Sequence, residues 1–250
     1  MSALATAQRP FFFIIDFELE KPIICPVEEA QELGFQFEIK GFRNFQPQDL
    51  KPDPVPLLVA PIAKTVYAQA YHKVIKEIYR GNTFLLNLTF PSVIETHLNL
   101  QDIFLLAKAP YKLLYENRFV IYSPECFVKI KDSQIYSYPM KGTIDAQLPD
   151  AKKKLQTDPK EINEHNTIVD LIRNDLSKIA REIAVTRFRY LDKIQTQKNQ
   201  IYHTSSEIKG KLSSDWKTRL PEILLDMLPA GSICGAPKAK TVSIIKNVEE

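Results

Sequence analysis

A lysine and a glutamate beside predicted strands are the first candidates for chemistry in this sequence. Lys141 lies in Pro139-Met140-Lys141-Gly142-Thr143, directly after a predicted strand. A neutral amine held there away from water could act as a nucleophile or a base, although most lysines are simply solvated. Glu125 lies at another strand junction and could act as a general acid, with an exposed turn glutamate as the alternative. Each of the two is a candidate for covalent or acid–base catalysis, against the default of a solvated lysine and an exposed turn glutamate.

Glu164 is a candidate metal ligand on a predicted helix. It shares a helical face with three later residues, at spacings of four, seven and eleven: Ile168, Leu171 and Asp175. A carboxylate buried on such a partly apolar face needs a cation, and Mg²⁺ takes one or two protein carboxylates and completes its shell with water and an anionic substrate. The alternative is an exposed helix acid, or an acid paired with Arg173.

Two glycine clusters could hold an anion. The chain has only 7 glycines, and Gly142 and the segment Gly231-Ser232-Ile233-Cys234-Gly235-Ala236-Pro237-Lys238 place glycine, hydroxyl and lysine together. A P-loop needs a lysine directly after its second glycine, so this mechanism of nucleotide binding does not fit. A turn that leads into a proline-started helix still presents free backbone N–H groups, which suit a carboxylate.

His203 is the most notable of the 4 histidines because Tyr202 and three hydroxyl residues flank it. Taken alone, it is interpreted as a hydrogen-bonded structural residue rather than a catalyst.

The elements that must position these residues alternate irregularly, which predicts an α+β fold rather than a doubly wound parallel sheet. The clearest signal is a helix capped by Asp158, with Pro159 at its first position and Glu161 completing a capping box, running to about Ala180. The other predicted helices are Thr65–Arg80, Leu100–Ala107, Leu220–Leu228 and one started by Pro237. The predicted strands include Phe11–Phe17, Phe35–Ile39, Thr83–Phe90, Phe119–Ser123, Cys126–Ile130 and Gln134–Tyr138, with a turn at Lys131-Asp132-Ser133 between the last two.

Composition and length set the class of protein. The 250 residues, 44% hydrophobic and 25% charged, predict one large globular domain over residues 1–250, with a short strand-rich portion over residues 1–60. A net charge of +3 is too balanced for a nucleic-acid binder. The 3 cysteines have neither disulfide nor metal spacing, which favours a reducing cytoplasm. No signal peptide or membrane-spanning segment is visible.

Six segments occur in the order typical of the chorismate-binding enzymes, and the chain resembles this family from about Ile78 to its end. The segments are GNTFLLNLT from Gly81, SPECF from Ser123, PMKGT from Pro139, EINEHNTIVDLIRNDL from Glu161, HTSSEIKG from His203 and GSICGAPKAKTVSII from Gly231. The resemblance implies a layered αββα fold with mostly antiparallel sheets. Family members continue past the position of Glu250, so it also implies that C-terminal strands are absent here.

Within the family, the residue at position 141 distinguishes between the possible reactions of chorismate. A lysine in PxKGT resembles the subunits that aminate chorismate at C4, component I of aminodeoxychorismate synthase, in the synthesis of p-aminobenzoate and folate. Anthranilate synthases usually have a small residue there, and isochorismate synthases need a lysine base at the position of Leu85. Two alternatives remain. The chain could be an anthranilate-forming enzyme, or it could be a catalytically incomplete fragment of the family that acts only as a binding module.

The resemblance also implies roles for individual residues. Lys141 is the implied nucleophile, Glu125 the general acid, His203 a hydrogen-bonding helper and Glu164 a ligand of Mg²⁺. The residues implied to bind the substrate are Gly142, Thr143, Gly231, Ser232 and Lys238. The expected partners are chorismate and a separate glutamine amidotransferase subunit that supplies ammonia.

Overall fold

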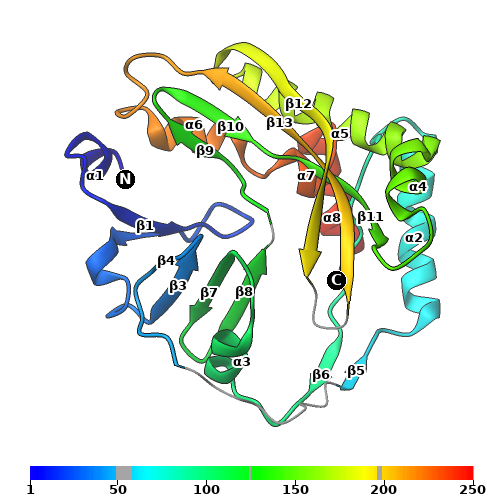
Figure 1. Ribbon diagram of the computed structural model, residues 1–250, viewed down its shortest axis with the longest axis horizontal. Coiled ribbons are helices and arrows are strands. Elements are labelled where there is room, and N and C mark those ends of the chain that lie inside the picture. The colour runs from blue at the N-terminus through cyan, green and yellow to red at the C-terminus, as the bar shows by residue number, and fades with distance from the viewer. Residues whose placement is uncertain (49–57, 124, 196–198, 250) are drawn as a thin grey trace. The chain divides into compact units, whose positions relative to one another are not determined.

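The computed structural model describes residues 1–250 except 49–57, 124, 196–198 and 250 (Figure 1). The chain divides into two compact units, each described here by itself. The first comprises Met1–Tyr79, Leu88–Pro124 and Lys246–Glu250, and the second comprises Arg80–Asn87 and Glu125–Ile245. The prediction of a single domain over the whole chain stays a prediction.

The first unit is built from small antiparallel sheets. A 4-stranded sheet has the order β4-β3-β7-β8, and two ribbons pair β1 with β2 and β5 with β6. The strands are β1 (Phe11–Ile14), β2 (Ile23–Pro26), β3 (Phe35–Ile39), β4 (Phe42–Arg43), β5 (Leu58–Ala60), β6 (Val93–Glu95), β7 (Tyr111–Tyr115) and β8 (Phe119–Ser123). The helices are α1 (Ser2–Thr6), the 3₁₀ turn η1 (Val27–Glu29), α2 (Lys64–Tyr79) and α3 (Leu100–Leu106). Its core contains an aromatic cluster in which the rings of Phe12 and Phe37 stack at 5.2 Å.

The second unit holds the candidate catalytic residues on a 5-stranded antiparallel sheet. β13 is central: β12 pairs with one side of it, and β11 and β10 pair with successive parts of the other side. The strands are β9 (Lys129–Lys131), β10 (Gln134–Ser137), β11 (Met140–Asp145), β12 (Arg181–Gln195) and β13 (Gln200–Lys211). The helices are α4 (Ala151–Thr157), α5 (Pro159–Ser177), α6 (Leu220–Met227), α7 (Gly231–Cys234) and α8 (Lys238–Val248), of which the part from Lys246 onward is counted with the first unit.

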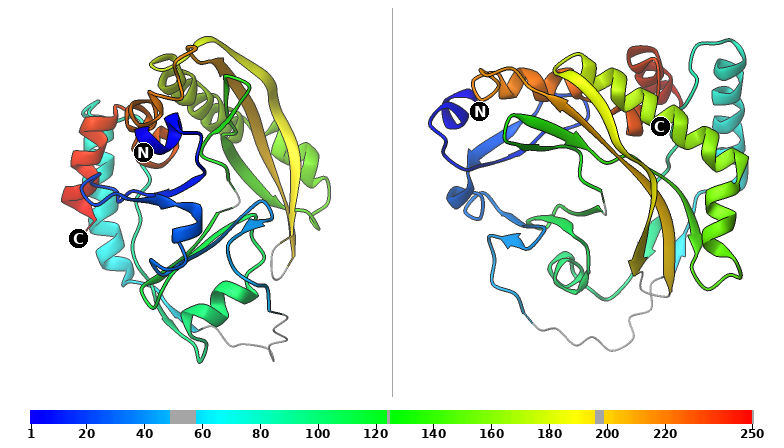
Figure 2. Two further views of the ribbon diagram at one scale, coloured as in Figure 1. Left: turned by 90° about the vertical axis from the view of Figure 1, so that its left-hand side faces the viewer. Right: turned by 45° about the horizontal axis from the view of Figure 1, so that its top comes forward.

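Helix α5 lies along one face of this sheet, as Figure 2 shows. The apolar side of the helix supplies Val169, Ile172 and Leu176, which pack with Ile135 of β10 and Ile208 of β13. The burial of this continuous aliphatic layer fixes the helix on the sheet. The polar residues at either end of α5 are thereby held in place.

Several predicted elements are confirmed. The Asp158 carboxylate accepts hydrogen bonds from the backbone amides of Lys160 and Glu161, with Pro159 as the first helical residue. The turn between β9 and β10 places Asp132 and Ser133 at φ +52° and +58°, as a two-residue hairpin of the primed type requires. All strand pairs of the described residues are antiparallel, so the predicted α+β class is confirmed.

The strand predicted over Thr83–Phe90 is wrong. Only Leu85 forms a β-bridge, to Ala236. The amide of Phe84 donates to the carbonyl of Ala236 at 2.9 Å, and the hydroxyl of Thr83 donates to the same carbonyl at 3.1 Å. Apolar alternation was present in this segment, but its backbone groups pair with a distant loop rather than with a sheet.

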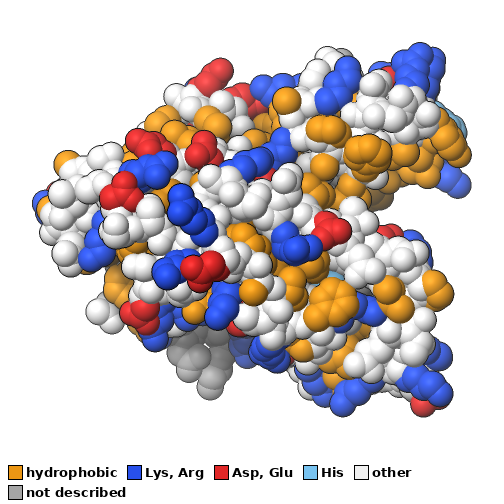
Figure 3. All heavy atoms as spheres, turned by 90° about the horizontal axis from the view of Figure 1, so that it is seen from above, with side chains coloured by type: hydrophobic (Ala, Val, Ile, Leu, Met, Phe, Trp, Pro, Cys, Tyr) orange, Lys and Arg blue, Asp and Glu red, His pale blue; other side chains and the backbone are white. Residues whose placement is uncertain are grey.

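The surface carries no block of charge of one sign on the face in Figure 3, where basic and acidic side chains are interspersed. Among the described residues, none of the helices is both long enough and apolar enough to span a bilayer.

Candidate active site

Lys141 lies on β11 at a β-bulge. It is opposite Thr204 of β13, whereas Thr143 is opposite His203, and the register shifts between these pairs. Gly142 supplies the irregularity because its φ is +81°, a conformation that residues with a Cβ rarely adopt. The hydroxyl of Thr204 donates to the carbonyl of Lys141. The bulge therefore re-aims the lysine side chain relative to a regular strand, and the central strand fixes its backbone.

Glu125 is half-buried and lies close enough to Lys141 to interact with it electrostatically. Burial raises the pKa of Glu125, and the positive charge of Lys141 offsets this in part. A carboxyl with a raised pKa keeps its proton at higher pH, as a general acid requires. Its neighbour Pro124 in the SPECF segment lies outside the described residues. The structure thus brings together the two residues that the sequence marked for covalent and acid catalysis.

His203 lies on β13 and is 8% exposed. Its Nε2 is 3.8 Å from the Oδ2 of Asp192. Burial lowers the pKa of His203, and Asp192 opposes this shift. Among the described residues, no hydrogen-bond partner is present for its Nδ1. A neutral imidazole with one unused ring nitrogen, next to Thr143 across the strand pair, suits a hydrogen-bonding role.

The first turns of α5 carry two carboxylates, one of which lies against β11. A Cβ added to Gly142 would come within 2.6 Å of the Oε2 of Glu161, so this carboxylate lies directly over the glycine. Glu164 follows one turn later, with a side chain that is 41% exposed and 3.7 Å from the Nζ of Lys160. The alternative pairing of Glu164 with Arg173 is wrong, because Arg173 pairs with Asp170 at 3.0 Å.

These carboxylates match the oxygen ligands that Mg²⁺ prefers. The described part of the chain contains no group of three or more His, Cys, Asp or Glu residues that could hold a metal ion. Mg²⁺ does not require such a group, since it is commonly bound through one or two carboxylates together with water and substrate oxygens. The residues present therefore fit this ion. Glu161 was not among the predicted ligands, although its spacing of three from Glu164 is a helical signal.

The Gly231 loop is the name used for residues 231–237, which comprise the short helix α7 and the three residues before α8. The side-chain amide of Asn87 donates to the carbonyls of Ser232 and Ile233, at 3.0 and 2.7 Å. Gly235 has φ +88°, and an added Cβ would overlap the carbonyl oxygen of Leu85. Two motifs far apart in sequence thus form one backbone-to-backbone contact, which explains why a glycine stands at position 235.

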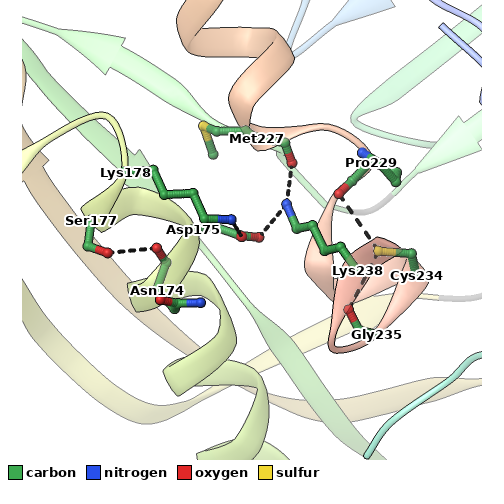
Figure 4. Close-up of polar contacts among 9 residues, drawn as sticks. All are labelled: Asn174, Asp175, Ser177, Lys178, Met227, Pro229, Cys234, Gly235 and Lys238. Carbon is green, nitrogen blue, oxygen red and sulfur yellow. Dashed lines mark hydrogen bonds and ion pairs between the residues drawn. The ribbon is translucent and has the colours of Figure 1, made fainter. Parts of the chain in front are cut away.

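Lys238 is engaged by protein groups. Its Nζ is 2.9 Å from the Oδ2 of Asp175 and donates to the carbonyl of Met227 at 2.8 Å (Figure 4). Asp175 lies eleven residues after Glu164 on α5, which is about 16 Å along the helix axis at 1.5 Å per residue. The structure therefore places Lys238 at the other end of α5 from Glu164. Substrate binding by Gly231, Ser232 and Lys238 stays a prediction.

His165 is a buried polar residue that the sequence analysis did not single out. It is 0% exposed, and its Nε2 is 2.6 Å from the Oγ of Ser206 on β13. Burial lowers the pKa of His165 to about 4, and the charge of Arg189 acts in the same direction. This hydrogen bond with Ser206 joins the first half of α5 to the central strand β13. The only sequence feature that could have drawn attention to His165 is its position directly after the candidate ligand Glu164.

Comparison with known proteins identifies several relatives of this chain. An uncharacterized PabA-like protein of Pasteurella multocida is 54% identical over 244 residues, which is 97% of this chain and 75% of that protein. Anthranilate synthase component 1 of Leptospira biflexa is 31% identical over 211 residues, and aminodeoxychorismate synthase component 1 of Bacillus subtilis is 26% identical over 216 residues. The alignments cover 78% and 81% of this chain, and 44% and 45% of those two proteins.

The fold is similar to that of solved structures. The menaquinone-specific isochorismate synthase of Escherichia coli superimposes with a TM-score of 0.58 at 17% identity, over 81% of this chain and 50% of that chain. The sequence profile described as chorismate binding enzyme matches residues 22–250. The chain therefore belongs to the chorismate-binding enzyme family.

Proposed function

We propose that this protein is the aminating component of aminodeoxychorismate synthase, which replaces the C4 hydroxyl of chorismate with an amino group. The observation that carries the proposal is that Lys141 lies near enough to Glu125 for its charge to offset part of the rise in the pKa of that half-buried carboxyl. A nucleophile and a proton donor that lie close together can divide one difficult substitution into two steps. The Bacillus subtilis relative bears the name of this activity.

The chemistry balances with these two groups and ammonia. The neutral Nζ of Lys141 forms a bond to C2 of chorismate while the C4–O bond breaks, and Glu125 supplies the proton with which the oxygen leaves as water. The proton released from the lysine nitrogen returns to Glu125. Ammonia then attacks C4, Glu125 protonates the lysine nitrogen as the C2–N bond breaks, and the Glu125 carboxylate takes up the proton that the new C4 amino group releases. The net change is chorismate plus ammonia to aminodeoxychorismate plus water.

The remaining site residues support the substrate. We propose that Glu164 holds Mg²⁺, which, when bound, would withdraw electron density from the ring carboxylate. Thr143 lies opposite His203 on the paired strands, and we propose that both hydrogen-bond substrate oxygens, while Gly142, Gly231 and Ser232 would offer backbone groups. A separate glutamine amidotransferase subunit would supply the ammonia.

The assay that tests the proposal incubates the chain with chorismate, Mg²⁺ and an ammonium salt, and follows aminodeoxychorismate by chromatography. We expect Lys141→Ala to abolish most turnover, and Lys153→Ala, an exposed lysine of α4, to retain it. Unchanged turnover by Lys141→Ala would reject the nucleophile. A fluorescent anthranilate product would instead favour the activity named for the Leptospira biflexa relative, and chorismate binding without product would favour a binding module.

A further inference from the structure

The carboxylate of Asp175 is almost completely buried at the C-terminal end of α5. Its side chain is 3% exposed and lies within 3.2 Å of two ammonium groups, those of Lys178 and Lys238. Lys178 is 46% exposed, whereas Lys238 is 17% exposed. Figure 4 shows Lys238 reaching from the start of α8 to both Asp175 and the Met227 carbonyl. One ammonium therefore joins α5, the end of α6 and the start of α8.

The same carboxylate also contacts the other end of the Gly231 loop. A Cβ added to Gly231 would lie 2.8 Å from the Oδ2 of Asp175, so the loop begins directly on this oxygen. Lys238, which follows the last residue of the loop, pairs with the same atom at 2.9 Å. Asp175 thus lies against the first residue of the loop and pairs with the residue immediately after its last.

Near its end, the loop pairs through Ala236 with the backbone of Phe84 and Leu85. The Ala236 amide donates to the Leu85 carbonyl at 3.3 Å, and the Ala236 carbonyl accepts from the Phe84 amide at 2.9 Å. Removal of the Asp175 charge would leave the Lys238 ammonium partly buried with only a carbonyl acceptor. A partly buried charge without its partner is unfavourable, so the lysine would turn toward solvent and release one end of the loop.

We propose that Asp175 and Lys238 form a clamp that sets the position of the Gly231 loop, and that Lys238 acts through Asp175 rather than by touching the substrate. Its effect on substrate rests on the proposed function, in which the loop contacts chorismate. Lys238 is thus a positioning residue.

Hydrogen exchange of the ligand-free protein tests the clamp independently of chorismate. We expect Asp175→Asn and Lys238→Met each to speed exchange of the loop amides about tenfold or more, with the amides of β12 unchanged. Lys178→Met is the matched control, because Lys178 pairs with the same carboxylate but does not reach the loop. Loop exchange that stays at the wild-type rate in a folded Asp175→Asn variant would overturn the clamp.

A double-mutant cycle on chorismate affinity separates positioning from direct contact. If Lys238 acts through Asp175, each single variant weakens chorismate binding by about tenfold, and the double variant Asp175→Asn/Lys238→Met is no weaker than either single variant. The double variant also leaves no unpaired buried charge, so it provides a folded protein if a single variant unfolds. A large loss in Lys238→Met with none in Asp175→Asn would show direct contact and overturn the proposal. If the wild type fails to bind chorismate, the proposed function fails, while the exchange experiment still decides the clamp.

Discussion

The buried imidazole of His165 makes the stability of the protein depend on pH. Its pKa is lowered from 6.5 to about 4. Between these two pH values the imidazole is mostly protonated in the unfolded state and mostly neutral in the folded state. Stability from this group is complete above pH 6.5 and falls as the pH drops toward 4. The loss amounts to about 2 kcal/mol between pH 7.5 and pH 5. His203, whose pKa burial also lowers, acts in the same direction.

Urea denaturation at pH 7.5 and pH 5 measures this effect. We expect His165→Gln, which can still hydrogen-bond Ser206, to reduce the loss of unfolding free energy at pH 5, and the exposed His72→Gln to leave it unchanged. Equal pH dependence in wild type and His165→Gln would contradict the assignment.

The proposed role of Glu164 as a Mg²⁺ ligand can be tested through chorismate binding. If it holds Mg²⁺, the ion should tighten chorismate binding, and Glu164→Gln should lose most of that gain because a neutral amide is a poorer ligand for a hard cation. Isothermal titration of chorismate with Mg²⁺ and with EDTA measures the difference. Asp170→Asn, another exposed carboxylate of α5, serves as the control and should keep the Mg²⁺ dependence. A wild-type affinity unchanged by EDTA would contradict the metal site.

The bulge in β11 can be tested at the scale of elements. Gly142→Ala places a Cβ at φ +81° and within 2.6 Å of the Glu161 carboxylate. The backbone conformation alone costs about 1–2 kcal/mol, and the contact adds to this. Gly41→Ala is the matched control, since its φ is +87° but nothing lies within 4 Å of the added atom.

Thermal and urea unfolding should therefore show a larger loss of stability for Gly142→Ala than for Gly41→Ala. The double variant Gly142→Ala/Glu161→Ala should recover part of the difference, because the contact is relieved while the backbone strain remains. Equal losses in the two single variants would show that Glu161 does not lie over the glycine.

Elements with local signals were predicted well. Asp158 and Pro159 determine the start of α5 from within one turn, and the β9–β10 turn depends on two adjacent residues. The segment after Gly81 was predicted wrongly because its alternation resembles that of a strand, while its partner is the Ala236 backbone some 150 residues later, as the separation of 153 for Thr83 and Ala236 shows. Propensity within a short window does not include such a partner.

At the level of the whole molecule, local motifs were again easier to predict than contacts between distant segments. The order of six motifs was sufficient to identify the family. Lys141, Glu125 and His203 were named as candidates from residue type and resemblance, and their roles stay predictions. The contacts of Glu161 with Gly142, and of Asp175 with Lys238, were not found, because each joins segments that only the folded sheet and α5 bring together. Residue type therefore predicts which groups can react, whereas tertiary packing decides which groups position them.

The central claim is that Lys141 forms a transient bond to the substrate, and mass spectrometry of the protein incubated with chorismate and Mg²⁺ but without ammonia tests it directly. We expect an adduct on Lys141 with the mass of chorismate less one water, which disappears when ammonia is added and is absent from Lys141→Ala. Ammonia-dependent formation of aminodeoxychorismate by a Lys141→Ala variant at the wild-type rate, with no adduct on the wild type, would contradict it.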